Sequence, residues 1–166
     1  LPAEARGQVR PPENWFGDSL ASLSVGCEIN VTALQSAVAY ATIANDGVRV
    51  SPHTIKEIRQ SDGTVFKATE PEKVRIVSPE TARSLRSMLR EVVLEGTGKM
   101  AQLNGYTSAG KTGTAQNPHG KDHSLFVGFA PRENPRIAIA VMVENAGFGA
   151  TWAAPIASLM MEKFMF

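Results

Sequence analysis

The chain has 166 residues, and its 17 Lys and Arg residues nearly balance its 16 Asp and Glu residues. This length fits one domain of ordinary size, and a net charge of +1 excludes the strongly basic surface typical of nucleic-acid or anionic-membrane binding. Apolar residues make up 43% of the chain, which excludes disorder, and the longest apolar run, 137–143, is far shorter than the roughly 20 residues of a membrane span.

The first segment, residues 1–16, is predicted to be extended, because it contains three prolines and shows no helical or strand period. The single cysteine, Cys27, excludes an internal disulfide and a thiolate metal cluster. Since no His partner accompanies it in the sequence, we interpret Cys27 as a small, half-buried side chain rather than a nucleophile.

A helix is predicted from about Thr32 to Ala44, because Thr32 and Gln35 have the spacing of a capping box and apolar residues recur on one face. Asn45-Asp46-Gly47 then supplies residues that tolerate a left-handed turn. Residues 48–58 alternate loosely before Ser61-Asp62-Gly63, which predicts a hairpin.

A second helix is predicted to begin at Ser78, a good N-cap, with Pro79 at its first helical position. The stripe expected to be buried contains Ala82, Leu85, Leu89, Val92 and Val93. The side chains expected to stay in water are Arg83, Arg86 and Arg90. Gly96-Thr97-Gly98 ends this helix, and a short amphipathic turn is expected over 99–103.

The last third of the chain predicts three strands, over 107–115, 124–130 and 136–144, followed by a helix that Pro155 opens. The short link 131–135 makes the last two strands an antiparallel pair. In the third strand Ile137, Ile139, Val141 and Val143 face one way, and Ala138 and Ala140 face the other. This pattern favours a sheet with helices on both faces. The terminal helix is expected to fill the core with Ile156, Leu159, Met160 and Phe164.

Residues 105–112 match the phosphate-binding loop pattern of Gly, four residues and Gly-Lys-Thr, which indicates a nucleotide-binding enzyme. That site needs a buried strand before the loop and a helix directly after it. Here helix-like sequence precedes Gly105, and Gly113 and Pro118 follow where the helix should begin. The flanking sequence therefore disfavours this interpretation, which stays as the alternative.

The other interpretation treats Lys111-Thr112-Gly113-Thr114 as a strand that lines a cleft. An exposed strand edge binds a peptide through its main chain, and glycine allows a ligand to approach the backbone closely. Lys111 supplies a positive charge for a carboxylate, and the hydroxyls of Thr112 and Thr114 share one face of the strand as further donors. This pattern predicts a surface that binds a carboxylate and an oxyanion.

Beyond this motif, seven segments together resemble the C-terminal part of the transpeptidase domain of class B penicillin-binding proteins, which cross-link the bacterial cell wall. They are residues 23–26, 31–35, 39–45, 95–98, 109–116, 126–131 and 153–155, in the order found in that family. The resemblance implies an α/β fold of the α+β type, with an antiparallel sheet between helices, like that of serine β-lactamases. We therefore expect residues 1–166 to form the C-terminal part of such a domain.

The resemblance also implies the chemistry. A serine attacks the penultimate D-alanine of a stem peptide, and an amine of a second peptide resolves the acyl-serine. Lys111, Thr112, Gly113 and Thr114 would bind the substrate; of these, Lys111 and the backbone N–H of Thr114, as an oxyanion donor, would be catalytic.

The nucleophilic serine of that mechanism is not expected in this chain. The only Ser-x-x-Lys is Ser108 to Lys111, and residues three apart on a strand point to opposite sides. No Ser-x-Asn triplet occurs. Because the chain starts at Leu1-Pro2-Ala3-Glu4, where the family has already passed both motifs, we expect the nucleophile-bearing part upstream and the isolated chain to be inactive. Cys27-Glu28 departs from the family pattern and puts that turn in question.

The expected partners are the D-Ala-D-Ala stem peptide, β-lactam antibiotics and the upstream part of the same protein. Proteins of the division or the elongation machinery are left open as further partners, and no nucleic acid and no cofactor are expected. His119 and His123 have metal-ligand spacing only for a helix, whereas the Gly and Pro around them predict a loop, so no metal is expected. The family places its catalytic domain on the periplasmic side of the bacterial inner membrane, with an anchor outside this chain.

Overall fold

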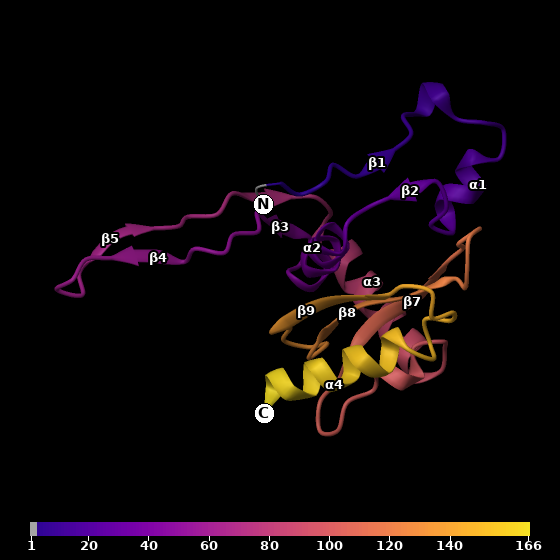
Figure 1. Cartoon of the computed structure of the whole chain (residues 1–166). Helices are drawn as coiled ribbons and strands as arrows, with labels where there is room; N and C mark the ends of the chain where they lie inside the picture. The colour runs from indigo at the N-terminus through magenta and orange to yellow at the C-terminus, as the bar shows by residue number, and fades with distance from the viewer. Residues whose placement is uncertain (1–2) are drawn as a thin grey trace.

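The computed structural model describes residues 3–166, and the largest sheet that it shows has three antiparallel strands (Figure 1). Its strands, in the order β7-β8-β9, are β7 (Ala109–Ala115), β8 (His123–Ala130) and β9 (Ile137–Val143). Every residue of β7 has a partner in β8, from Ala109 opposite Phe129 to Ala115 opposite His123. The three predicted strands are confirmed, with small differences at their ends.

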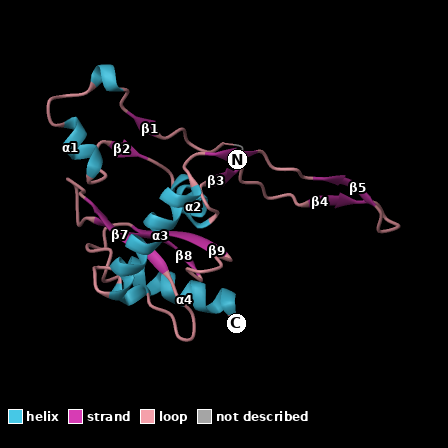
Figure 2. Ribbon diagram, turned by 180° about the vertical axis from the view of Figure 1, so that it is seen from behind, coloured by secondary structure: helices cyan, strands magenta, loops and turns pink. Residues whose placement is uncertain are grey.

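Helices cover both faces of this sheet, as predicted (Figure 2). On one face, α2 (Ala33–Ala44) packs on β8 and β9, and α3 (Pro79–Leu94) packs on β7. On the other face lies α4 (Ala153–Met165), together with the 3-10 turn η2 (Lys99–Ala101). None of the described helices combines the length and the apolar character needed to cross a bilayer.

The two faces of the sheet differ in the size of their side chains. On the α4 side, Phe126 and Ile139 are buried in one cluster with alanines of α4 and with Met161. The opposite side of β9 presents Ala138 and Ala140 toward α2, because side chains alternate along a strand. Small residues on both α2 and β9 let this helix lie close to the sheet.

The helix α4 buries a different set of side chains from the one predicted. Leu159, Met160 and Phe164 are 67%, 52% and 50% exposed. The buried residues are Ala153, Ala154, Ala157, Met161 and Met165. Since branched and aromatic side chains of β8 and β9 already fill this side of the sheet, the helix approaches it through alanines and leaves its larger residues outside.

The predicted ends of α2 are confirmed. The Thr32 hydroxyl accepts the N–H of Gln35 at 3.0 Å, and the Gln35 side chain accepts the N–H of Thr32 at 2.9 Å, which is a capping box. Asp46 and Gly47 follow with φ of +50° and +83°. Gly47 suits this position for two reasons: its φ is positive, and a Cβ there would lie 2.2 Å from the carbonyl oxygen of Val77.

The predicted hairpin is correct at its turn and wrong in its strands. The turn at 61–63 joins β4 (Glu57–Arg59) to β5 (Val65–Ala68), but β3 (Val48–Val50) pairs instead with β6 (Lys73–Arg75). Pro52, which lacks a backbone N–H, lies between β3 and β4 and separates the two strands. The β4–β5 hairpin extends away from the rest of the chain (Figure 1).

The N-terminal segment is only partly extended. The strand β1 (Gln8–Val9) pairs with β2 (Ile29–Asn30), but a 3-10 turn, η1 (Pro12–Asn14), interrupts the predicted extended segment where Pro12 presets a helical φ. The short helix α1 (Ser19–Ser24) follows. Leu1 and Pro2, with which the proposed family motif begins, lie outside the described residues.

The arginine stripe of α3 was predicted to stay in water, and this is wrong for two of its members. The Arg86 side chain is 13% exposed and donates to Ala44 O at 3.1 Å and to Asp46 Oδ1 at 2.6 Å. Arg90 donates to Ser108 O at 3.0 Å. The carbonyls at the end of α2 carry partial negative charge, which attracts a cation from the neighbouring helix. Arg83 is exposed, as predicted.

Candidate functional site

The predicted binding strand lies at an edge of the sheet. Lys111, Thr112, Gly113 and Thr114 are all within β7, and β8 is the only strand that pairs with β7 among residues 3–166. The other edge of β7 therefore has main-chain groups that point away from the sheet. The central structural prediction, an extended segment at the rim of a sheet, is confirmed.

The phosphate-loop interpretation of residues 105–112 is wrong. Lys111 and Thr112 lie inside β7, which continues to Ala115, whereas a phosphate loop must lead directly into a helix. The backbone amides of this segment alternate in direction along a strand, so they do not converge on one anion. The chain therefore lacks, in this described segment, the geometry that the nucleotide-binding alternative needs.

The side chains of the binding strand divide between two faces. Thr112 lies opposite Phe126 and Thr114 opposite Ser124, so both hydroxyls are on the face that carries α4. The alternation of a strand puts Lys111 on the other face, where its side chain is exposed and Nζ donates to the carbonyl of Thr112 at 2.9 Å. The prediction that the two threonines share a face is confirmed.

Ser108 is not a partner of Lys111. Its side chain is fully buried, and its hydroxyl donates to the carbonyl oxygen of Ala101 in η2 at 2.6 Å. Ser108 and Lys111 point to opposite sides of the chain, as three-residue spacing in an extended segment requires. The Ser-x-x-Lys match is therefore a coincidence of sequence and forms no nucleophile.

The hydroxyl of Thr97 lies against the binding strand, and the sequence analysis did not assign this residue to the site. Thr97 follows the end of α3, and its Oγ1 lies 2.6 Å from Oγ1 of Thr112. In the sequence, residues 96–98 are interpreted as a helix stop and as part of a segment that resembles the family, but Thr97 receives no role in the site. The signal that could have found it is a hydroxyl residue held between two glycines, a pattern that suits a loop packed tightly against a neighbour.

The loop between β9 and α4 packs beneath the end of the binding strand. Gly149 N–H donates to Thr114 Oγ1 at 3.5 Å, and a Cβ on Gly149 would lie 2.4 Å from the carbonyl oxygen of Gly113. Ser124 fastens this loop, because its hydroxyl donates to Phe148 O at 3.0 Å and accepts Ala153 N–H at 3.1 Å. The position of Gly113 and Thr114 thus depends on a loop far away in sequence.

The β7–β8 connection is closed by side chains rather than by a helix. Nδ1 of His123 accepts the backbone N–H of Asn145 at 3.1 Å, and Asn117 Nδ2 donates to Asn145 Oδ1 at 2.6 Å. His119 lies exposed in the loop, as predicted. Across the described part of the chain, no three His, Cys, Asp or Glu side chains are grouped so that they could hold a metal ion.

The departure from the family pattern at Cys27-Glu28 has a structural role. Glu28 has φ of +61°, and its carboxylate lies 3.2 Å from the Arg10 guanidinium and accepts the Ser19 hydroxyl at 3.1 Å. Ser19 is fully buried. These contacts join the β1 and β2 segments. Cys27 is exposed, so the expectation of a half-buried side chain is wrong.

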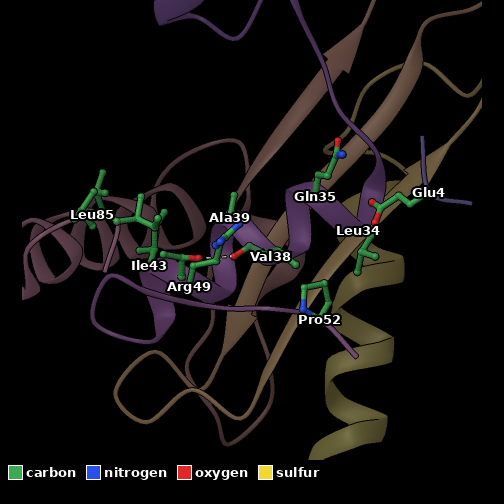
Figure 3. Close-up of a pocket in the computed structure, with 12 residues that line it drawn as sticks. Glu4, Leu34, Gln35, Val38, Ala39, Ile43, Arg49, Pro52 and Leu85 are labelled. Carbon is green, nitrogen blue, oxygen red and sulfur yellow. Dashed lines mark hydrogen bonds between the residues drawn. The ribbon is translucent and has the colours of Figure 1, made fainter. Parts of the chain in front are cut away.

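A groove lies beside α2, separate from the binding strand, and no residue of β7 lines it (Figure 3). This groove has a volume of about 590 Å³ and is mainly apolar. Its apolar lining comes from α2, from α3 and from the segments next to β3 and β6, and includes Leu34, Val38, Ile43, Pro52, Val77 and Leu85. At its rim the Thr32 hydroxyl donates to Glu4, which lowers the pKa of that carboxyl.

Comparison with known families supports the resemblance seen in the sequence. Residues 1–162 match the family described as the penicillin binding protein transpeptidase domain. Two relatives are the penicillin-binding proteins PbpB of Mycolicibacterium smegmatis, 44% identical over 98% of this chain, and of Mycobacterium tuberculosis, 41% identical over 87%. The chain spans 29% and 24% of the lengths of these two relatives.

Solved structures show the same fold. Penicillin-binding protein 3 from Mycobacterium tuberculosis, in complex with aztreonam, matches 99% of this chain with a TM-score of 0.87 and 38% identity, and 41% of that protein is covered. The D,D-transpeptidase domain of a peptidoglycan glycosyltransferase from Eggerthella lenta matches 83% of this chain with a TM-score of 0.74 and 34% identity; 33% of it is covered. The mixed α/β fold with an antiparallel sheet is therefore confirmed.

Proposed function

This chain belongs to the family of penicillin-binding protein transpeptidase domains, and from that premise we propose that it forms the carboxylate- and oxyanion-binding part of a peptidoglycan D,D-transpeptidase. The observation that carries the proposal is the extended edge strand Lys111–Thr114, whose cation and two hydroxyls lie beside open main-chain groups. A relative of the same family was solved with aztreonam and with ampicillin, which supports β-lactams as ligands of this site.

The proposed reaction proceeds through an acyl-serine. The serine hydroxyl attacks the carbonyl carbon of the penultimate D-alanine, its proton passes to the leaving terminal D-alanine, and an ester forms. The amine of a second stem peptide then attacks that ester and releases the serine, which regains a proton. A β-lactam enters the same first step, but its ring opens and the leaving nitrogen stays attached.

Each residue of the strand has a role in this proposal. The terminal carboxylate would lie at the open edge of β7, between the two faces of the strand. Lys111 balances its negative charge from one face, and the hydroxyls of Thr112 and Thr114 donate to it from the other. The N–H of Thr114 is one of two donors to the oxyanion, a contribution whose loss raises a barrier by about 3 kcal/mol. Gly113 leaves room for the substrate main chain to pair with the edge of β7.

The nucleophile is proposed to lie in an upstream part of the same protein. The helix α2 is apolar around most of its circumference, as is typical of a helix with neighbours on every side, yet one side of it faces the groove of Figure 3. We assign this groove to contacts with the upstream part. The whole enzyme would act on the periplasmic side of the inner membrane, with proteins of the division or elongation machinery as further partners.

Labelling with a fluorescent penicillin tests this function. We expect covalent labelling of the full-length protein, no labelling of the isolated chain, and loss of labelling in full-length Lys111→Ala. The matched control is Lys67→Ala, which removes a lysine from the exposed hairpin strand β5. Labelling that survives Lys111→Ala, or micromolar binding of ATP by the isolated chain, would contradict the proposal.

A further inference from the structure

The hydroxyl of Thr97 is the only side-chain hydrogen-bond partner of the Thr112 hydroxyl in the structure of residues 3–166, at 2.6 Å between the two Oγ1 atoms. The two residues belong to different elements, because Thr97 follows α3 and Thr112 lies in β7. Either oxygen could be the donor on distance alone. Which of them donates decides what Thr112 can offer to a ligand.

The backbone holds Thr97 in place on both sides. Gly96 N–H donates to Glu91 O at 3.2 Å, and Gly98 N–H donates to Val92 O at 3.0 Å, so the loop is tied to the last turn of α3. A Cβ on Gly96 would lie 2.8 Å from the carbonyl oxygen of Val92, and one on Gly98 would lie 3.1 Å from it. The two glycines thus allow a close fit that presents the Thr97 hydroxyl in a defined position.

The number of protons favours one direction for this bond. A threonine hydroxyl has one proton to donate and can also accept. If Thr112 gave its proton to Thr97, it would have none left for a carboxylate. The neighbouring Thr114 shows the other arrangement, because its hydroxyl accepts the Gly149 N–H at 3.5 Å, and a backbone N–H can only donate. The Thr114 proton is therefore free for a ligand.

We propose that Thr97 is a positioning residue, which donates its proton to Thr112 and so directs the single Thr112 proton toward the carboxylate of the bound substrate or β-lactam. This inference rests on the proposed function of the edge strand. Accepting one hydrogen bond also makes a hydroxyl a better donor, because hydrogen bonds in a chain polarise one another. Thr97 acts through Thr112 and has no role of its own in acyl transfer.

The test measures acylation of the full-length protein by a fluorescent penicillin over a range of concentrations, which separates the dissociation constant from the acylation rate constant. Thr97→Val should raise the dissociation constant about three- to tenfold, the effect expected for one hydrogen bond, while the acylation rate constant changes less than about twofold. Thr97→Ser, which restores the hydroxyl, should restore tight binding. The matched control is Thr81→Val, which removes a similar bond between Thr81 and Ser78 hydroxyls, 2.9 Å long, at the other end of α3.

A double-mutant cycle shows whether Thr97 acts through Thr112. Adding Thr97→Val to Thr112→Val should produce no further change in the dissociation constant. A penicillin methyl ester, which lacks the carboxylate, should bind wild type and Thr97→Val equally. A dissociation constant that stays at the wild-type value in Thr97→Val would overturn the inference. Effects of the two substitutions on this constant that simply add would overturn it as well. Absence of labelling in the wild-type full-length protein would instead overturn the proposed function.

Discussion

Residues 82–165 and residues 3–81 differ in what they bury, although both are rich in apolar side chains. All of the buried apolar residues among those that the structure describes lie in the later region, at 82, 93, 101, 109, 126, 129, 130, 139, 153, 154, 157, 161 and 165. In the earlier described region, the buried side chains are the polar Ser19 and Thr42, whereas Phe16, Leu20 and Phe66 are more than half exposed. Apolar content by itself therefore does not predict a core.

The reason is that the later region contains a three-stranded sheet, whereas the sheets within residues 3–81 have two strands each. The strands β7, β8 and β9 offer two wide faces, and helices cover both. The earlier region has two-stranded ladders, which are too narrow to bury side chains and are marginal alone in water. Figure 1 shows the β4–β5 hairpin projecting away from the other elements. Such a region depends on neighbours, whereas the later one has its own core and takes from the earlier region mainly α2, which covers β8 and β9 on one face of the sheet.

Substitution of one phenylalanine in each region should produce the largest contrast. Phe126→Ala removes a fully buried ring from the cluster between β8 and α4, and we expect the free energy of unfolding to fall by about 3–5 kcal/mol. The control Phe66→Ala, at a ring that is 69% exposed, should cost less than about 0.5 kcal/mol. Denaturant unfolding followed by circular dichroism measures both, and equal losses would contradict the comparison.

Two glycines provide the next contrast. A Cβ on Gly149 would lie 2.3 Å from Leu125 O and 2.4 Å from Gly113 O, so Gly149→Ala should displace the loop or β7. We expect a loss of about 1–3 kcal/mol in unfolding free energy, the usual cost of overpacking, together with weaker penicillin labelling of the full-length protein. Gly17 has nothing within 4 Å of its Cβ position, so Gly17→Ala should leave both quantities nearly unchanged. Penicillin labelling of Gly149→Ala at the wild-type level would contradict the expectation that this loop sets the position of Gly113.

The contact between the two regions can be tested at an arginine. Arg86 joins α3 to the end of α2 through Ala44 O and Asp46, and Arg86→Met should lower the unfolding free energy by about 1–2 kcal/mol. Arg83, which is exposed on the same helix, is the control, and Arg83→Met should change it by less than about 0.5 kcal/mol. Should the two substitutions have the same effect, Arg86 would not be a structural link.

Lowering the pH should loosen the turn of the β4–β5 hairpin. Of the changes described here, this one should alter the free energy of unfolding least. Hydrogen bonds from the Thr64 side chain and backbone lower the pKa of Asp62. A lowered pKa in the folded state means that the stabilisation is present above the ordinary carboxyl pKa, about 3.9, and is lost as the pH falls through the folded value. Nuclear Overhauser effects between Ile58 and Lys67, which are cross-strand partners, should weaken in that range. Asp62→Asn should remove this dependence on pH.

The features of this protein that follow from its sequence depend on residues close together in the chain. The capping box of Thr32 and Gln35, the N-cap at Ser78 and the turn at Asp62 involve spacings of only a few residues, so local geometry alone determines them. The alternation in β9 is likewise visible as a period of two, and the extended geometry of the binding strand follows from its own Thr and Gly residues and from the Gly and Pro that disfavour a helix after it. The short motifs that make the family recognisable are local in the same sense, since each occupies a few consecutive residues.

Other features are decided by the packing of segments that are distant in sequence. No local pattern could reveal that Thr97 lies against Thr112, that Gly149 lies beneath Gly113, or that Arg86 binds the end of α2. The pairing of β3 with β6 and the buried face of α4 have the same origin. Backbone conformation follows from near neighbours in the chain, whereas the partner of a side chain depends on which surfaces fit together once the whole chain has folded.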